Sequence, residues 1–342
     1  MPLRKYRATI KDIATRTGVS ANTVSRTLRG LPHIHPETRQ RILEVAKQLN
    51  YKRNLLARSL VLKRTESVGV VITDTSNPNY SRIIRGVEDY LYQHNINLMV
   101  SSSIGDEVRE RSVIDLFLER AVDGMIVTPT MKSFAAIEEI VRRHVPLVLT
   151  NRYFKGHPMD AVRVDNVNSI KRLTHYLLDL GHERIVYFGG HEYVTTAEDR
   201  YVGYRKAMQE ARRKPAPAVF CGTAREPDKV NRALVKLLRG KSRPTAILCY
   251  NDDLAVEVMH RLLDMGLSVP EDISVAGFDD IDMAAMLRVP LTTVAQPTYL
   301  IGRKAAELLL RRINGDMADF PQQILLETNI MVRASTGPPP AR

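Results

Sequence analysis

The hydrophobic positions of this chain follow two patterns, which change near residue 64. Between residues 8 and 50, apolar residues recur at helical spacing in three short runs. Thr9 and Ser20 are candidate N-caps for the first two helices. Gly18 suits the stop between them, and Pro36 suits the first turn of the third helix. We predict a second helix over residues 21–29 and a third whose apolar face comprises Ile42, Leu43, Val45, Ala46 and Leu49.

After residue 65, short apolar runs alternate with amphipathic stretches. Such alternation predicts parallel sheets covered by helices on both faces. The strands are too many for one doubly wound sheet, so we predict two lobes. The predicted strands are 68–74, 97–103, 124–128, 147–151, 161–164, 185–188, 218–221, 246–250, 273–278 and 292–294. The clearest predicted helices are 80–94, 107–120, 168–180 and 254–265.

The first two predicted helices, joined by a short turn around a glycine, form a helix-turn-helix motif. In this motif the N-terminal residues of the second helix face base edges in the major groove. We therefore predict base contacts from Ala21, Asn22 and Arg26, since Asn pairs with adenine and Arg with guanine. The alternative is a solvated polar helix face. The residues suited to phosphate contacts are Thr9, Ser20, Thr23 and Ser25.

The distribution of charge supports a nucleic-acid partner. Residues 1–64 hold 15 Lys and Arg against three acidic residues, which is the whole net charge of +12. Residues 65–342 hold 35 basic and 35 acidic residues. Clustered basic side chains on a folded module favour binding to a duplex by counterion release, so the N-terminal module is the predicted DNA-binding part.

Polar residues follow nearly every predicted strand of the neutral body. Doubly wound sheets bind ligands beyond the carboxyl ends of their strands. Hydroxyl, amide and carboxylate groups there suit a neutral polyol, either a sugar or a nucleoside. The alternative is that these residues are polar only because loops face water.

Several motifs of other protein classes are absent from the sequence. It has no phosphate-binding G-x-x-x-x-G-K-[ST], no G-x-G-x-x-G after a strand, no G-x-S-x-G and no H-E-x-x-H. We therefore expect no enzyme, no cofactor and no metal site, and we read Cys221 and Cys249 as buried apolar residues. There is no long apolar run and no signal peptide, so we expect a cytoplasmic protein without a membrane partner. Residues 337–342, with three prolines, predict a disordered tail.

The N-terminal motifs resemble those of one known family. The runs Ala8–Ala14, Gly18–Ser20 and Thr23–Arg26, then Asn50-Tyr51 and Asn54–Leu60, are similar to the DNA-binding headpiece and hinge of the lactose/galactose repressor (LacI/GalR) family. The resemblance implies an all-α helix-turn-helix headpiece over residues 1–52. It also implies a hinge helix over residues 53–65, in which Leu60 wedges into the minor groove. Arg53 replaces a frequent proline of the family, and the predicted hinge contacts with phosphates are Arg53, Asn54 and Arg58.

The resemblance also implies an α/β core over residues 66–336, two-lobed and similar to periplasmic binding proteins. The first lobe would comprise about 66–165 and 296–323, and the second about 166–292 and 326–336. The crossovers are expected near residues 165–168, 292–296 and 322–325. The predicted effector contacts are Tyr80, Thr128, Asn151, Arg200, Asn251, Asp279 and Gln296. Thr223 and Ala224 stand where some relatives place an aromatic residue against the ligand, which favours a carbohydrate over a purine.

These features together predict a ligand-controlled transcription factor. We expect a homodimer that binds a near-palindromic operator and represses genes of carbohydrate use. The helices over residues 80–94 and 107–120 are the expected dimer contacts. No leucine heptad follows the core, so we expect a dimer rather than a tetramer. The alternative is an activator, or a regulator that needs a purine or another metabolite as co-repressor. A binding protein without regulatory function and an enzyme on a Rossmann-like body fit the sequence less well.

Overall fold

The computed structural model describes residues 8–28, 30–51, 64–224, 226–240 and 243–341. The chain divides into two compact units, Met1–Thr65 and Glu66–Arg342, and each is described by itself. The predicted hinge contacts Arg53, Asn54, Arg58 and Leu60 lie outside the described residues.

The described residues of the first unit form three short helices, α1 (Ile10–Thr17), α2 (Ala21–Leu28) and α3 (Pro36–Gln48). Thr9 caps α1, since its hydroxyl accepts from the Asp12 backbone N–H at 3.3 Å while the Asp12 carboxylate accepts from the Thr9 N–H at 2.7 Å. Gly18 ends the helix in the left-handed conformation, with φ 68°. The buried core of the unit is Ile13, Val24, Ile42 and Ala46. Leu43 was predicted to join this core, but it is 47% exposed because it lies on the outer side of α3.

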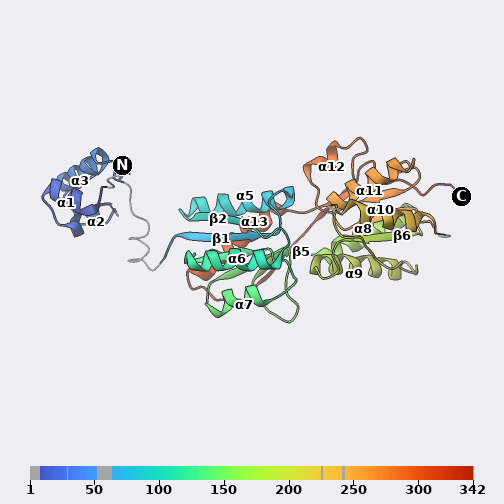
Figure 1. Cartoon of the computed structure of the whole chain (residues 1–342), viewed down its shortest axis with the longest axis horizontal. Coiled ribbons are helices and arrows are strands. Elements are labelled where there is room, and N and C mark those ends of the chain that lie inside the picture. The colour runs from blue at the N-terminus through green and yellow to red at the C-terminus, as the bar shows by residue number, and fades with distance from the viewer. Residues whose placement is uncertain (1–7, 29, 52–63, 225, 241–242, 342) are drawn as a thin grey trace, which may run out of the picture. The chain divides into compact units, whose positions relative to one another are not determined.

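The first lobe of the second unit is built on a six-stranded parallel sheet (Figure 1). Its order is β11-β5-β4-β3-β1-β2, and every residue of β1 is buried because helices cover both faces. The strands are β1 (Ser67–Ile72), β2 (Asn97–Ser102), β3 (Gly124–Val127), β4 (Leu147–Thr150), β5 (Ala161–Val164) and β11 (Gln323–Leu326). The helices are α5 (Pro78–Gln93), α6 (Glu107–Glu119), α7 (Ala135–Arg142) and α13 (Thr298–Ile313).

The second lobe repeats this plan with a four-stranded parallel sheet in the order β7-β6-β8-β9. The strands are β6 (Ile185–Gly189), β7 (Val219–Phe220), β8 (Ala246–Cys249) and β9 (Ser274–Ala276). The helices are α8 (Asn166–Asp179), α9 (Thr195–Glu210), α10 (Pro227–Leu238), α11 (Asp252–Asp264) and α12 (Asp282–Met286). Strands β10 (Thr293–Ala295) and β12 (Asn329–Met331) pair with each other in antiparallel fashion.

The chain passes between the lobes three times, and the third passage differs from the prediction. Residues 322–325 were expected to be a crossover, but Gln323–Leu326 is the edge strand β11, which pairs with β5. The first lobe therefore extends to Leu326, and the crossover follows it.

The tail also begins later than predicted. The Gly337 N–H donates to Ser274 Oγ at 3.1 Å and the Gly337 carbonyl accepts from His182 at 2.8 Å, so this residue belongs to the body.

None of the described helices has the length and apolar character needed to cross a membrane.

Candidate functional site

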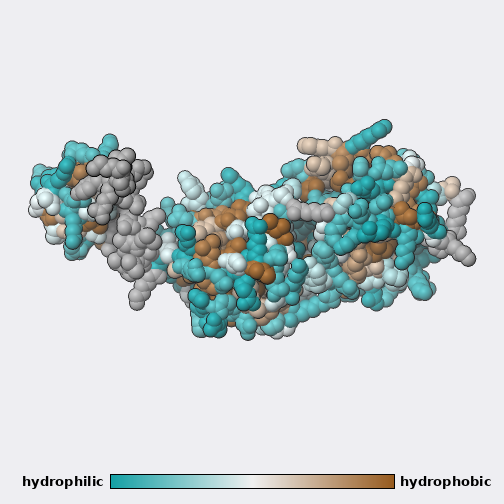
Figure 2. Space-filling view, in the orientation of Figure 1, coloured by the Kyte–Doolittle hydropathy of each residue, from teal (hydrophilic) through white to brown (hydrophobic). Residues whose placement is uncertain are grey.

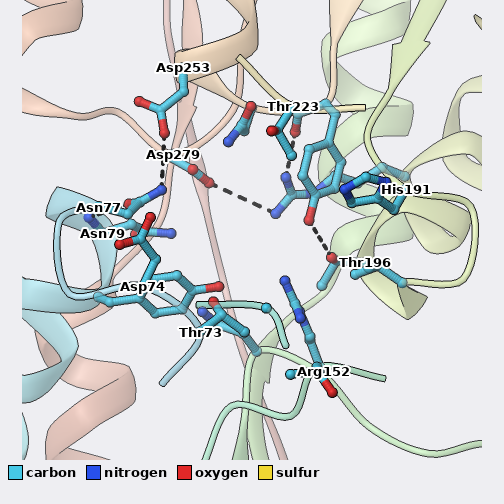
Figure 3. A pocket seen from close by; sticks show the side chains of 18 of the residues that line it. Thr73, Asp74, Asn77, Asn79, Arg152, His191, Thr196, Thr223, Asp253 and Asp279 are labelled. Atoms are coloured by element: carbon cyan, nitrogen blue, oxygen red, sulfur yellow. Dashed lines mark hydrogen bonds and ion pairs between the residues drawn. The ribbon is translucent and has the colours of Figure 1, made fainter. Parts of the chain in front are cut away.

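A cavity of about 360 Å³ lies between the two lobes, and side chains of both lobes line it (Figure 3). Most of these side chains follow the carboxyl ends of parallel strands. Thr73 and Asp74 follow β1, Asn151 and Arg152 follow β4, and Asp279 follows β9. The position of the cavity is the one that the doubly wound topology favours for a ligand.

Arg200 on α9 is the most extensively held side chain of the cavity. Its Nε donates to Asn166 Oδ1 at 2.9 Å, and its Nη1 donates to the Tyr250 carbonyl. The guanidinium carbon lies 3.6 Å from the centre of the Phe278 ring. The simpler interpretation, a surface ion pair with Asp199, is wrong, because Arg200 is buried and Asp199 instead accepts from the Tyr153 hydroxyl at 3.1 Å.

Asp279, labelled in Figure 3, lies beside Arg200. Arg200 Nη2 is 3.9 Å from Asp279 Oδ1, and Gln296 Nε2 donates to the same oxygen at 2.6 Å. Burial raises the pKa of Asp279 to about 8, although the charge of Arg200 acts in the opposite direction. The Asp279 carboxyl group is therefore mostly protonated at pH 7.

The remaining predicted effector residues differ in how they meet the cavity. Asn251 lines it, but its Oδ1 is already engaged, accepting from the Leu254 N–H at 3.1 Å to cap α11. Asn151 adopts a left-handed backbone, with φ 62°, and no described group pairs with its buried Oδ1. Tyr80 lines the cavity, and burial raises the pKa of its phenol.

Thr128 does not line the cavity, contrary to the prediction. Its hydroxyl is buried and lies 2.7 Å from the hydroxyl of Thr150, so the two side chains satisfy each other beneath the cavity. Arg152, which follows Asn151, does line it and was not predicted; its Nη1 donates to the Pro129 carbonyl at 2.7 Å. The other lining residues that sequence reasoning did not select include Asn77, Lys132, Asn166, His191, Tyr193, Tyr250 and Asp253.

Two groups of contacts join the lobes beside the cavity. On one side Asn77 Nδ2 donates to Asp253 Oδ2 at 3.0 Å, and Arg82 pairs with Asp282. On the other side Tyr153 donates to Asp199, and Lys155 pairs with Glu198. These contacts stabilise the observed arrangement of the two lobes.

The helix-turn-helix unit presents its predicted contact residues at the start of α2. Ser20 Oγ accepts from the Thr23 N–H at 3.1 Å and caps the helix, while Ala21 and Asn22 are exposed. Arg26 turns back toward the turn, where its Nη2 donates to the Pro32 carbonyl at 3.4 Å. Within the part of the chain that the structure describes, no group of three or more His, Cys, Asp or Glu residues is placed to hold a metal ion.

Comparison with known proteins identifies the chain. The model of bacterial regulatory proteins of the lacI family matches residues 9–54, and the model of periplasmic binding protein-like domains matches residues 174–336. The sequence is 30% identical to the ribose operon repressor of Haemophilus influenzae over 96% of this chain and 98% of that protein. The chain belongs to the LacI family.

Further relatives agree with this LacI-family assignment. The chain is 34% identical to the transcriptional repressor PurR of Vibrio cholerae over 90% of its length and 91% of the relative. A lac repressor dimer bound to operator and an anti-inducer has the same fold, with a TM-score of 0.86, 24% identity and coverage of 97% of this chain and 99% of that one. The family resemblance and the fold class predicted from sequence are confirmed, and the chain is a DNA-binding transcriptional regulator.

Proposed function

We propose that this regulator represses genes of carbohydrate use and that a sugar in the inter-lobe cavity controls its affinity for operator DNA. The observation that carries the proposal is the cavity itself, which places hydroxyl, amide, carboxyl and guanidinium groups of both lobes around one space. A ligand with several hydroxyl groups would satisfy donors and acceptors on both sides at once. Its binding would therefore alter the free-energy difference between closed and open lobes.

A sugar fits the cavity better than a purine. Thr223 and Ala224 line the position after β7 and offer no aromatic face there for a base to stack on. Asn151 Oδ1 has no described partner, and a hydroxyl group of a sugar can supply it. The two relatives reported above are named for ribose and for purines, so both classes belong in the ligand screen.

We propose that α2 reads the operator. Ala21, Asn22 and Arg26 would contact bases, while Thr9, Ser20, Thr23 and Ser25 would contact phosphates. Residues 53–65 would form a hinge helix on DNA, with Leu60 as the minor-groove wedge and Arg53, Asn54 and Arg58 on phosphates. A helix this short needs its DNA and a partner to be stable, so a small change in lobe angle can control it.

The regulator is proposed to act in the cytoplasm as a homodimer. Exposed apolar side chains on the first lobe include Tyr92 of α5 and Val108 of α6, which are 82% and 74% exposed, and Val100 of the edge strand β2. The second lobe exposes Met283 and Met286 on α12, where Figure 2 shows apolar surface. Burial of these side chains against a second copy would remove them from water, and the paired headpieces would match a near-palindromic operator.

A thermal-shift screen of the full chain against pentoses, hexoses, disaccharides, sugar phosphates and purines tests the ligand. A ligand at 100 times its dissociation constant adds about 2.7 kcal/mol of stability. Arg200→Ala should abolish the shift, and Arg205→Ala, an exposed position on the same helix, is the matched control. A mobility-shift titration with operator DNA then gives the sign of control. Release by the ligand supports an inducible repressor, tighter binding identifies a co-repressor, and a purine hit would reject the sugar.

A further inference from the structure

Arg152 lines the cavity with most of its hydrogen-bonding capacity unused. A guanidinium group has five N–H donors, and the described contact of Arg152 uses one of them, from Nη1 to the Pro129 carbonyl. Among the residues that the structure describes, no carboxylate forms an ion pair with this side chain. The side chain is only partly exposed, so its charge is incompletely hydrated, and the cavity offers a cation without an ion-pair partner to whatever occupies it.

Two buried arginines of the molecule show how such a charge is held here. Arg312 meets Asp160 through two nitrogens, at 2.7 and 3.1 Å, and both side chains are buried. Arg200 donates hydrogen bonds to Asn166 and to the Tyr250 carbonyl, beside the carboxyl group of Asp279. Arg152 differs from Arg312 because no carboxylate among the described residues forms an ion pair with it.

Glu110 is the carboxyl group that acts electrostatically on Arg152, but it forms no ion pair with it. Glu110 Oε2 accepts from the Thr130 N–H at 2.6 Å, its Oε1 has no described partner, and burial raises its pKa although the charge of Arg152 acts in the opposite direction. Asp253 accepts from Asn77, and Asp279 accepts from Gln296. In Figure 3, Arg152 reaches into the cavity from the side opposite Asp253 and Asp279.

Two further basic side chains line the same cavity. Lys132 stands over the Tyr193 ring at 5.9 Å from its centre, and His191 lies 3.7 Å from Glu226. The cavity thus has a hydrogen-bonding region around Arg200 and Asp279, and a guanidinium cation at Arg152.

From this geometry we infer that the effector is an anionic sugar, whose carboxylate or phosphate group binds Arg152 while its hydroxyl groups meet Arg200, Asp279 and Gln296. This inference rests on the proposed function and specifies its ligand class. The planar guanidinium presents parallel N–H donors that match the paired oxygens of a carboxylate or a phosphate. A neutral sugar would leave the cation without a partner.

The test compares each neutral sugar with its own acid and phosphate at constant ionic strength, because salt screens charge. Calorimetry on the full chain would use D-glucose, D-gluconate and D-glucose 6-phosphate, then D-ribose, D-ribonate and D-ribose 5-phosphate, with inorganic phosphate as a simple anion. The protein variants are Arg152→Gln, which removes the charge, Arg152→Lys, which keeps it, and Arg205→Gln as the control on an exposed surface.

The expected result is that an acid or a phosphate binds at least about tenfold more tightly than its neutral parent, the range measured for hydrogen bonds to charged groups. Arg152→Gln should abolish that preference, so that the charged forms bind no more tightly than their neutral parent, and Arg152→Lys should retain part of it. The compound that binds more tightly than the neutral sugar, either the acid or the phosphate, identifies the anionic group of the effector.

Three results would overturn the inference. If a neutral sugar binds as tightly as its charged forms, the anionic ligand is wrong while the proposed sugar control stands. If the preference for charge survives in Arg152→Gln, the anion binds elsewhere. If no compound binds, inorganic phosphate included, both this inference and the sugar proposal fall.

Discussion

Replacing Asp279 by Asn should remove a large pH dependence from the stability of the protein. Asp279 is buried, Gln296 donates to it at 2.6 Å, and Arg200 lies 3.9 Å away. Burial raises its pKa from 3.8 to about 8. Asparagine has nearly the shape of a protonated carboxyl group and cannot ionise, so the variant mimics the neutral form at every pH.

The magnitude follows from the change in pKa. A shift of about four units, at about 1.36 kcal/mol per unit, corresponds to about 5 kcal/mol. Below pH 4 the carboxyl group is protonated in both folded and unfolded chains. As the pH rises, the unfolded chain ionises first, so the stability present at low pH is lost between about pH 4 and pH 8. Burial also raises the pKa of Asp252, to about 6, so the stability linked to Asp252 is already lost by about pH 6.

The assay is urea unfolding of the full chain, followed by circular dichroism at pH 5, 6, 7 and 8. The stability of Asp279→Asn relative to the natural protein should rise by up to about 1.4 kcal/mol per unit between pH 6 and pH 8. Asp115→Asn, at an exposed position of α6 with no described ion pair, is the matched control. If the Asn variant were less stable by a constant 3–5 kcal/mol or so at every pH, the carboxylate would be charged and paired with Arg200, and the reasoning would be refuted.

Three further predictions concern packing and DNA. Gly302→Ala should lower stability by about 3 kcal/mol in urea unfolding, because a Cβ there would lie 1.9 Å from the Ile83 carbonyl oxygen, whereas Gly240→Ala should cost far less. Thr9→Ala should lower the stability of the headpiece by about 1 kcal/mol, measured by thermal melting, and Thr9→Ser should restore it, since the cap would return. Asn22→Ala should weaken operator binding by about 1–3 kcal/mol in a mobility-shift titration without lowering the melting temperature; an unchanged affinity would mean that α2 does not read bases through this side chain.

The regular elements could be predicted because burial shaped their sequences. All six residues of β1 are buried, and a short, largely apolar run of that length predicts a buried strand of a parallel sheet. Strand β11 was missed for the opposite reason. It lies at the edge of the sheet, Gln323 and Leu325 are exposed, and the strand is only four residues long. An edge strand needs no continuous apolar pattern, so the sequence there was read as a crossover.

The site was predictable to the level of strand ends, but not to the level of individual side chains. The topology brings the carboxyl ends of the strands to one cleft, which is why residues after β4 and β9 were correctly expected to meet. Whether a given side chain then faces the cavity depends on the local backbone. Thr128 turns toward Thr150, whereas Arg152 enters the cavity after a residue with positive φ, Asn151.

The missing counter-charge of Arg152 shows why the class of ligand needs the structure. In the sequence, the polar residues after the strands suggested a neutral polyol, and acidic residues are as numerous as basic ones after residue 64. Ion pairing, however, depends on the positions of charges rather than on their totals. Asp160 pairs with Arg312, whereas Arg152 forms no ion pair with a carboxylate among the described residues. The net charge of the body therefore does not reveal the local positive charge in the cavity, and a charged sugar would bind to that local charge.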